Sequence, residues 1–122
     1  MPEVLRHVTY ELYNPESGRL DGVRLAEFLD LPTKDVADIT GFTDRYVRKD
    51  PDAPSFQDSL RKVALIIRGL LRLTGGDVGQ VKIWLKAPHP DLEDASPLDL
   101  MRGHEIDVVV DLVDDMLSGA PA

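Results

Sequence analysis

Residues 84–119, WLKAPHPDLEDASPLDLMRGHEIDVVVDLVDDMLSG, contain the start and stop signals of the helices at the end of the chain. The stretch opens on the only tryptophan of the sequence, is broken by two nearby prolines, and restarts as a helix after Ser96. A serine followed by a proline and, three positions later, by an aspartate is a strong helix start, because the serine caps the first turn and the proline fits its first position. Gly103 ends this short helix, and a longer helix is expected to run to Gly119.

The closing helix of this stretch is amphipathic, with an apolar stripe that is expected to be buried and an acidic opposite face. The acids repel one another at helical spacing, and the last of them lie at the end of the helix where the macrodipole disfavours negative charge. Two interpretations stay open: the acidic face only meets water, or a basic partner surface offsets its local cost. The stripe consists of Ile106, Val109, Val110, Val113, Met116 and Leu117, and the acidic face of Asp107, Asp111, Asp114 and Asp115.

Charge is distributed unevenly along the 122 residues, whose formal net charge is −8. Residues 1–50 carry a net charge of −3, residues 51–86 carry +3, and residues 87–122 carry −8. The overall balance argues against a protein that coats nucleic acid without specificity. The asymmetry predicts two different kinds of partner.

A second motif lies in residues 33–48, TKDVADITGFTDRYVR. Gly41 can take the positive φ that turns one helix sharply into the next. Ala37 is small where the second helix is expected to cross, and Val47 is placed to pack back onto the first helix. This is the spacing of a helix-turn-helix.

The second helix of this motif is expected to have a basic exposed end. Thr33 and Thr43 are the expected N-caps of the two helices. Arginine and lysine suit phosphates and guanine edges, and a threonine at a helix N-terminus suits a phosphate. Acidic residues close by leave open a second interpretation, a helical hairpin with a solvated basic end. The predicted DNA-binding residues are Thr43, Arg45, Tyr46, Arg48 and Lys49.

Three further helices follow from the apolar periodicity. Residues 21–31 form one that begins at a capping aspartate and ends before a proline. Residues 56–73 form the main core helix, and its broad apolar face favours contacts beyond one neighbour, including a dimer partner. Residues 77–87 form a third, in which Trp84 is expected to anchor the core.

The first twenty residues are the least informative. Val8, Tyr10 and Leu12 alternate, which allows a short strand, and a frayed arm is the other interpretation. Together the patterns predict an all-α fold, with a helix-turn-helix part packed against a C-terminal helical module. The expected boundaries are an N-terminal arm at 1–20, the helix-turn-helix and core helix at 21–76, and the C-terminal module at 77–122.

The sequence contains no recognisable signal for catalysis or for metal binding. The absence of cysteine excludes disulfides and thiol chemistry and fits a reducing compartment. The three histidines are isolated, and no nucleotide-binding or nucleophile motif occurs. No apolar run is long enough to span a membrane, and the N-terminus has no signal-peptide pattern. We therefore expect a soluble cytoplasmic protein that is not an enzyme and holds no metal or cofactor.

From Leu25 to Gly119 the chain resembles the Xre/MbcA/ParS-type antitoxins of bacterial toxin–antitoxin pairs. The family often has a Gly-Gly pair in the proline-rich loop, where this chain has Glu93-Asp94. The order of helix-turn-helix, long helix, Trp-Leu helix, proline loop and C-terminal module is similar throughout. The best part of the resemblance comprises Trp84-Leu85, the loop with Pro88 and Pro90, the helix start from Ser96 to Leu100, Gly103, and the valine-rich helix that closes at Gly119.

The resemblance implies an antitoxin with two working parts. One would bind the promoter of its own operon, with the protein as a dimer. The other would bind a RES-domain toxin that consumes NAD, and would block its active site. The toxin-binding residues that it implies are Pro97, Leu98, Met101, Arg102, His104, Glu105, Asp107 and Asp111.

Two alternatives remain at this point. In one, the chain is a stand-alone helix-turn-helix transcriptional regulator whose acidic module only dimerises. In the other, it is an adaptor that does not bind DNA.

Overall fold

The computed structural model describes residues 10–119, and helices make up the regular structure of that part. No strand occurs within it, although an antiparallel bridge joins Tyr13 and Leu20. The predicted all-α class is therefore confirmed. The helices are α2 (Gly22–Leu29), α3 (Thr33–Thr40), α4 (Asp44–Lys49), η1 (Pro54–Phe56), α5 (Gln57–Leu73), α6 (Val78–Lys86), η2 (Pro90–Leu92), α7 (Pro97–Arg102) and α8 (Ile106–Ser118).

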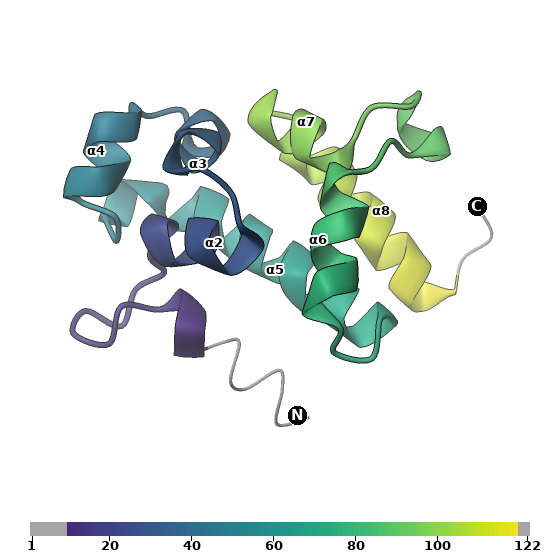
Figure 1. The fold of residues 1–122 in the computed structure, drawn as a ribbon, viewed down its shortest axis with the longest axis horizontal. Helices are drawn as coiled ribbons and strands as arrows, with labels where there is room; N and C mark the ends of the chain where they lie inside the picture. The colour runs from purple at the N-terminus through teal and green to yellow at the C-terminus, as the bar shows by residue number, and fades with distance from the viewer. Residues whose placement is uncertain (1–9, 120–122) are drawn as a thin grey trace.

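Helix α5 is the central element of the fold (Figure 1). Helices α2, α3 and α4 gather at its N-terminal end, and α6, α7 and α8 gather at its C-terminal end. Both groups contribute to one continuous apolar core. Phe56, Leu60 and Ile67 are fully buried within it, as the broad apolar face of this segment predicted.

The described part of the N-terminal segment is packed on the core. Tyr10 and Leu12 lie in a helical turn, so the alternation did not mark a strand there; Val8 lies outside the described residues. Leu12 and Leu20 are both buried. The side chain of Gln57 accepts a hydrogen bond from the Leu20 amide at 3.0 Å and donates one to its carbonyl at 2.9 Å. These contacts fix the segment against the start of α5.

Helices α3 and α4 are joined by a three-residue turn at the predicted position. Gly41 ends α3 with a φ of 80°, which a glycine adopts without strain. Ala37 and Val47 are buried where the two helices cross. Helix α2 packs on the same point through Gly22, where an added Cβ would lie 3.2 Å from Val36 Cγ1 and 3.3 Å from Val47 Cγ1.

One of the two predicted caps in this region is wrong. Thr43 caps α4, because its hydroxyl accepts a hydrogen bond from the Tyr46 amide at 3.1 Å. Thr33 is instead the first residue of α3, and Pro32 takes the cap position without a side-chain bond. The Thr33 hydroxyl donates to an Asp44 carboxylate oxygen at 2.5 Å, so this residue links the starts of α3 and α4.

The helix start predicted at Ser96 is confirmed. The Asp99 amide donates to the Ser96 hydroxyl at 3.0 Å, and the Ser96 amide donates to the Asp99 carboxylate at 3.4 Å. This reciprocal capping box satisfies two backbone donors that the helix would otherwise leave unpaired. In the preceding loop, Glu93 and Asp94 have φ values of 55° and 65°, so they hold the left-handed conformation that glycines adopt most easily.

Helix α8 lies beside the C-terminal half of α5 (Figure 1). The close approach depends on Gly69 of α5, because an added Cβ there would lie 2.5 Å from Val113 Cγ1. Val109 and Val113 are buried in this contact. Leu117 belongs to the predicted stripe but remains 39% exposed. The buried stripe of α8 is therefore narrower than the sequence pattern indicated.

Candidate functional sites on α8 and α4

The acidic face of α8 is exposed along its length, as predicted. Asp107 forms an ion pair with Lys62 of α5 at 2.9 Å. Within residues 10–119, Asp111, Asp114 and Asp115 have no cationic partner within ion-pair distance. No basic residue lies in the last turn of α8 to balance the helix dipole. This face therefore carries uncompensated negative charge that a basic surface could meet.

Three of the predicted partner-binding residues are not surface residues. Pro97, Leu98 and Met101 are buried, and Met101 has no exposed area at all. Leu98 and Met101 form part of the core where α7 packs on α6 and α8, and Pro97 is buried at the start of α7. Burial leaves these three little surface for a partner, so their direct contact with a partner stays a prediction.

Arg102 ties α7 to α3. Its guanidinium donates to Asp35 at 3.1 Å and to Asp99 at 2.7 Å. The Asp35 carboxylate, which is the larger cause, raises the pKa of Arg102 above its ordinary value. Hydrogen bonds from Ser96, with a further one from Arg102, lower the pKa of Asp99. The guanidinium is therefore occupied within the chain, and its first role is to hold the two halves of the molecule together.

The turn between α7 and α8 brings the two predicted sites close together. His104 holds a left-handed φ of 63° and is exposed, as is Glu105. A Cβ added at Gly41, in the turn between α3 and α4, would lie 3.6 Å from His104 Cε1. The exposed part of the predicted toxin-binding set consists of His104, Glu105, Asp107 and Asp111.

Helix α4 presents most of the predicted DNA-binding residues. Thr43, Arg45, Arg48 and Lys49 are exposed, and Arg48 also pairs with Asp44 of its own helix at 3.2 Å. The basic end of α4 lies on the outside of the molecule, away from the core.

Tyr46 differs from the other four predicted residues because it packs on the core. Its ring centroid lies 5.2 Å from that of Phe56 and 5.3 Å from that of Phe42, in edge-to-face geometry. Tyr46 is therefore a support for α4 more than a freely exposed contact. Phe42 was not among the predicted site residues, and its position beside the capping Thr43 was the available signal.

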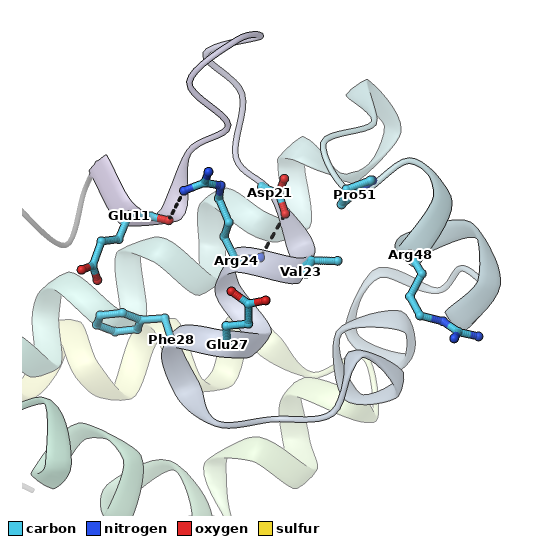
Figure 2. A pocket seen from close by; sticks show the side chains of 8 residues that line it. All are labelled: Glu11, Asp21, Val23, Arg24, Glu27, Phe28, Arg48 and Pro51. Carbon is cyan, nitrogen blue, oxygen red and sulfur yellow. Dashed lines mark hydrogen bonds between the residues drawn. The ribbon is translucent and has the colours of Figure 1, made fainter.

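An open pocket of about 640 Å³ lies between the N-terminal segment, α2 and the end of α4 (Figure 2). The carboxylate of Asp21 accepts from the Arg24 amide at 3.0 Å, which is the N-cap of α2. The Arg24 guanidinium donates to the Glu11 carbonyl at 3.5 Å. The side chain of Arg48 points away from Arg24 and Glu11 (Figure 2). These polar groups serve local structure, and they do not converge on a point where a substrate atom could react.

The described residues also give no metal site. Between residues 10 and 119, no three histidine, cysteine, aspartate or glutamate side chains gather as metal ligands would. None of the described helices is long and apolar enough to cross a membrane.

The chain is similar to a solved structure over most of its length and to a known protein family over its C-terminal part. The structure is similar to a chain of the crystal structure of the M. tuberculosis MbcT-MbcA toxin-antitoxin complex, with a TM-score of 0.60 and 25% sequence identity. The match covers 83% of this chain and 94% of that one. Residues 70–119 match the family described as the antitoxin Xre/MbcA/ParS C-terminal toxin-binding domain. The C-terminal part of the chain is therefore similar to the toxin-binding domain of the Xre/MbcA/ParS antitoxins, and most of the chain is similar in fold to a chain of a toxin-antitoxin complex.

These two matches confirm the resemblance drawn from the sequence. The span that matches the family contains the last turn of α5 and all of α6, α7 and α8. It therefore includes the α7–α8 turn and the acidic face of α8. A search of curated proteins gave no match to the sequence.

Proposed function

We propose that this antitoxin neutralises a RES-domain toxin that consumes NAD, and that it does so by covering the toxin's active site with the α7–α8 region. The observation that carries the proposal is the match of residues 70–119 to a toxin-binding domain, on a segment that carries most of the net negative charge. A toxin–antitoxin complex as the structural relative supports the same partner class. The protein acts by binding and not as an enzyme.

The contact surface of the proposed complex is the exposed set at the α7–α8 turn: His104, Glu105, Asp107 and Asp111. A pocket that holds the pyrophosphate of a dinucleotide is typically basic, so an acidic lid complements it electrostatically. Arg102 can contribute at the edge of this surface, although its guanidinium already bonds to Asp35 and Asp99. Pro97, Leu98 and Met101 hold the surface in shape from below.

We also propose that α3 and α4 bind the promoter of the antitoxin's own operon and repress it. Arg48 and Lys49 are exposed cations in the last turn of a short helix, and Thr43 and Arg45 are exposed at its start. Such side chains contact phosphates and base edges when a helix enters the major groove. A homodimer would place two such helices on a symmetric operator.

The toxin proposal is tested by growth rescue on co-expression with the neighbouring gene's product and by copurification of the two proteins. Deleting residues 97–122 would be a poor test, because it would also remove Val109 and Val113 from the core. The better variant combines Glu105→Lys with Asp111→Lys, two exposed positions without an ion pair in the described part of the chain.

We expect this double variant to fold normally, to lose rescue, and to lose copurification. The matched control combines Glu16→Lys with Glu27→Lys, which makes the same change in net charge outside the matched span and should keep rescue. Rescue by both variants would reject the proposed contact surface. Absence of any toxin that copurifies with the wild-type chain would favour the stand-alone regulator instead.

The DNA proposal is tested with Arg45→Ala combined with Arg48→Ala. We expect promoter binding to be abolished in a gel-shift assay while rescue from the toxin is retained. Promoter binding that survives would show that α4 is not the recognition element. A wild-type chain that never binds the promoter would favour an adaptor without DNA-binding activity.

A further inference from the structure

A groove of about 300 Å³ runs between α5 and α8, over the glycine that lets the two helices approach. Leu65 and Leu117 form its apolar rims, with exposures of 53% and 39%. Two large side chains exposed beside one groove favour a protein partner more than isolated surface leucines do. Val110 and Val113 continue the apolar lining along α8.

The two banks of the groove carry opposite charge. Arg68 and Arg72 lie on the α5 bank, and Asp114 lies on the α8 bank. No ion pair joins the two banks at this level in residues 10–119. Farther toward the start of both helices, Lys62 and Asp107 do pair across them at 2.9 Å.

From this arrangement we infer that the α5–α8 groove is the interface of a homodimer, with its two-fold axis parallel to the groove. Such an axis places the α5 bank of one copy opposite the α8 bank of the other. Arg72 then faces the partner's Asp114, and the leucine rims close over one another. An axis across the groove would instead set arginine against arginine, which like-charge repulsion disfavours.

This inference rests on the proposed function, because it assigns a surface to the dimer that promoter binding calls for. In this arrangement the toxin and the second copy of the chain bind different parts of α8. The toxin would meet the α7–α8 turn and the first half of α8, and the second copy would meet the last half. One chain could then bind both partners at once.

The test uses charge reversal in the full-length chain and analytical ultracentrifugation. Arg72→Glu and Asp114→Lys each change an exposed side chain that has no ion pair in the described structure. Because each reversal occurs at two symmetric places in the dimer, we expect each variant to raise the dissociation constant at least about tenfold. Mixing the two variants should restore association, since each introduced charge then faces its opposite.

Asp115→Lys is the matched control, because its side chain is exposed on α8 but does not line the groove, and it should dimerise like the wild type. The inference is overturned if the wild type is monomeric at tens of micromolar, if either reversal dimerises normally, or if the mixture does not associate. If both reversals abolish toxin copurification and their mixture stays monomeric, the groove belongs to the toxin. That result overturns the dimer interface and leaves the proposed toxin binding intact.

Discussion

Helices α4 and α7 have the same length, but α4 is mostly exposed and α7 is half buried. Each has six residues and begins at a hydroxyl N-cap. Helix α4 buries one residue, Val47, and leaves its basic end in solvent. Helix α7 buries Pro97, Leu98 and Met101 and ties its one basic residue into an ion-pair network.

The difference shows what each helix can present to a partner. A helix that buries one side chain has most of its surface free, so α4 can itself be an interface. A helix that buries half of its residues is an anchor, so α7 presents a partner with the turn that follows it. Substitutions in α7 and in the residues that pack against it should therefore lower the free energy of unfolding most. Substitutions in α4 and in the α7–α8 turn should mainly change partner binding.

The largest effect is expected from Met101→Ala. The side chain is fully buried, so its truncation should lower the free energy of unfolding by about 2–5 kcal/mol. Arg45→Ala on α4 should change it by less than about 0.5 kcal/mol, because an exposed residue without a partner contributes little. Urea denaturation of both variants measures the difference. Similar losses for the two would contradict the contrast between anchor and presented helix.

The next largest loss of stability is expected from replacing the glycines on which the two regions pack, Gly69 beneath α8 and Gly22 beneath α3 and α4. Gly69→Ala would place its Cβ 2.5 Å from Val113 Cγ1, so it should cost about 1–3 kcal/mol as α8 is pushed off α5. Gly22→Ala, beneath α3 and α4, meets its neighbours only at 3.2 Å and 3.3 Å and should cost less.

Gly79→Ala provides the control for this comparison. Gly79 is exposed within α6, and its nearest contact for an added Cβ is the side chain of Asp77. The substitution should stabilise the protein by up to about 1 kcal/mol, since it removes the entropy cost of a helical glycine. Thermal melts of the three variants should therefore differ in sign. A stabilising Gly69→Ala would contradict the close approach of α5 and α8.

Removing the N-cap side chain of α7 or of α4 should lower the free energy of unfolding by a smaller amount. Ser96→Ala removes one half of a reciprocal capping box and should cost about 1–2 kcal/mol. Thr43→Ala removes a single hydrogen bond to the Tyr46 amide, and its cost should lie toward about 0.5–1 kcal/mol. Denaturant midpoints decide the order. A larger loss at Thr43 would show that α4 depends on its cap more than α7 does.

The smallest effect is a dependence on pH that only α7 should show. Hydrogen bonds from Ser96 and Arg102 lower the pKa of Asp99, so its ionised form favours the folded state. The stabilisation is fully present above the ordinary aspartate pKa, about 4, and is lost as the pH falls through the lowered pKa. The difference in stability between the wild type and Asp99→Asn should therefore shrink in acid. The Thr43 cap has no titrating group, so the cost of Thr43→Ala should be constant over the same range.

Much of the local structure could be predicted because it depends on neighbours in the sequence. The caps at Asp21, Asp77 and Ser96, and the turn at Gly41, follow from short-range hydrogen bonds and backbone preferences. The error at Thr33 has a local cause as well, since Pro32 already held the extended cap position and Thr33 found a bond to Asp44.

The candidate site was harder to predict, because exposure depends on which face each helix buries. The sequence pattern grouped Met101 with Arg102 and His104 as neighbours in the chain, although only the last is freely exposed. Tyr46 was expected on the surface, but it packs against Phe56 from the next segment. Neither result follows from spacing alone.

The amino-acid sequence was sufficient to predict the all-α class, the order of the helices, and the concentration of negative charge after residue 87. These depend on composition and on contacts within a few residues. Three features required the folded chain: the ion pair of Arg102 with Asp35, the packing of α8 on Gly69, and the groove whose two sides carry opposite charge. These pairs lie more than 40 positions apart, and only the packing of the whole chain brings them together.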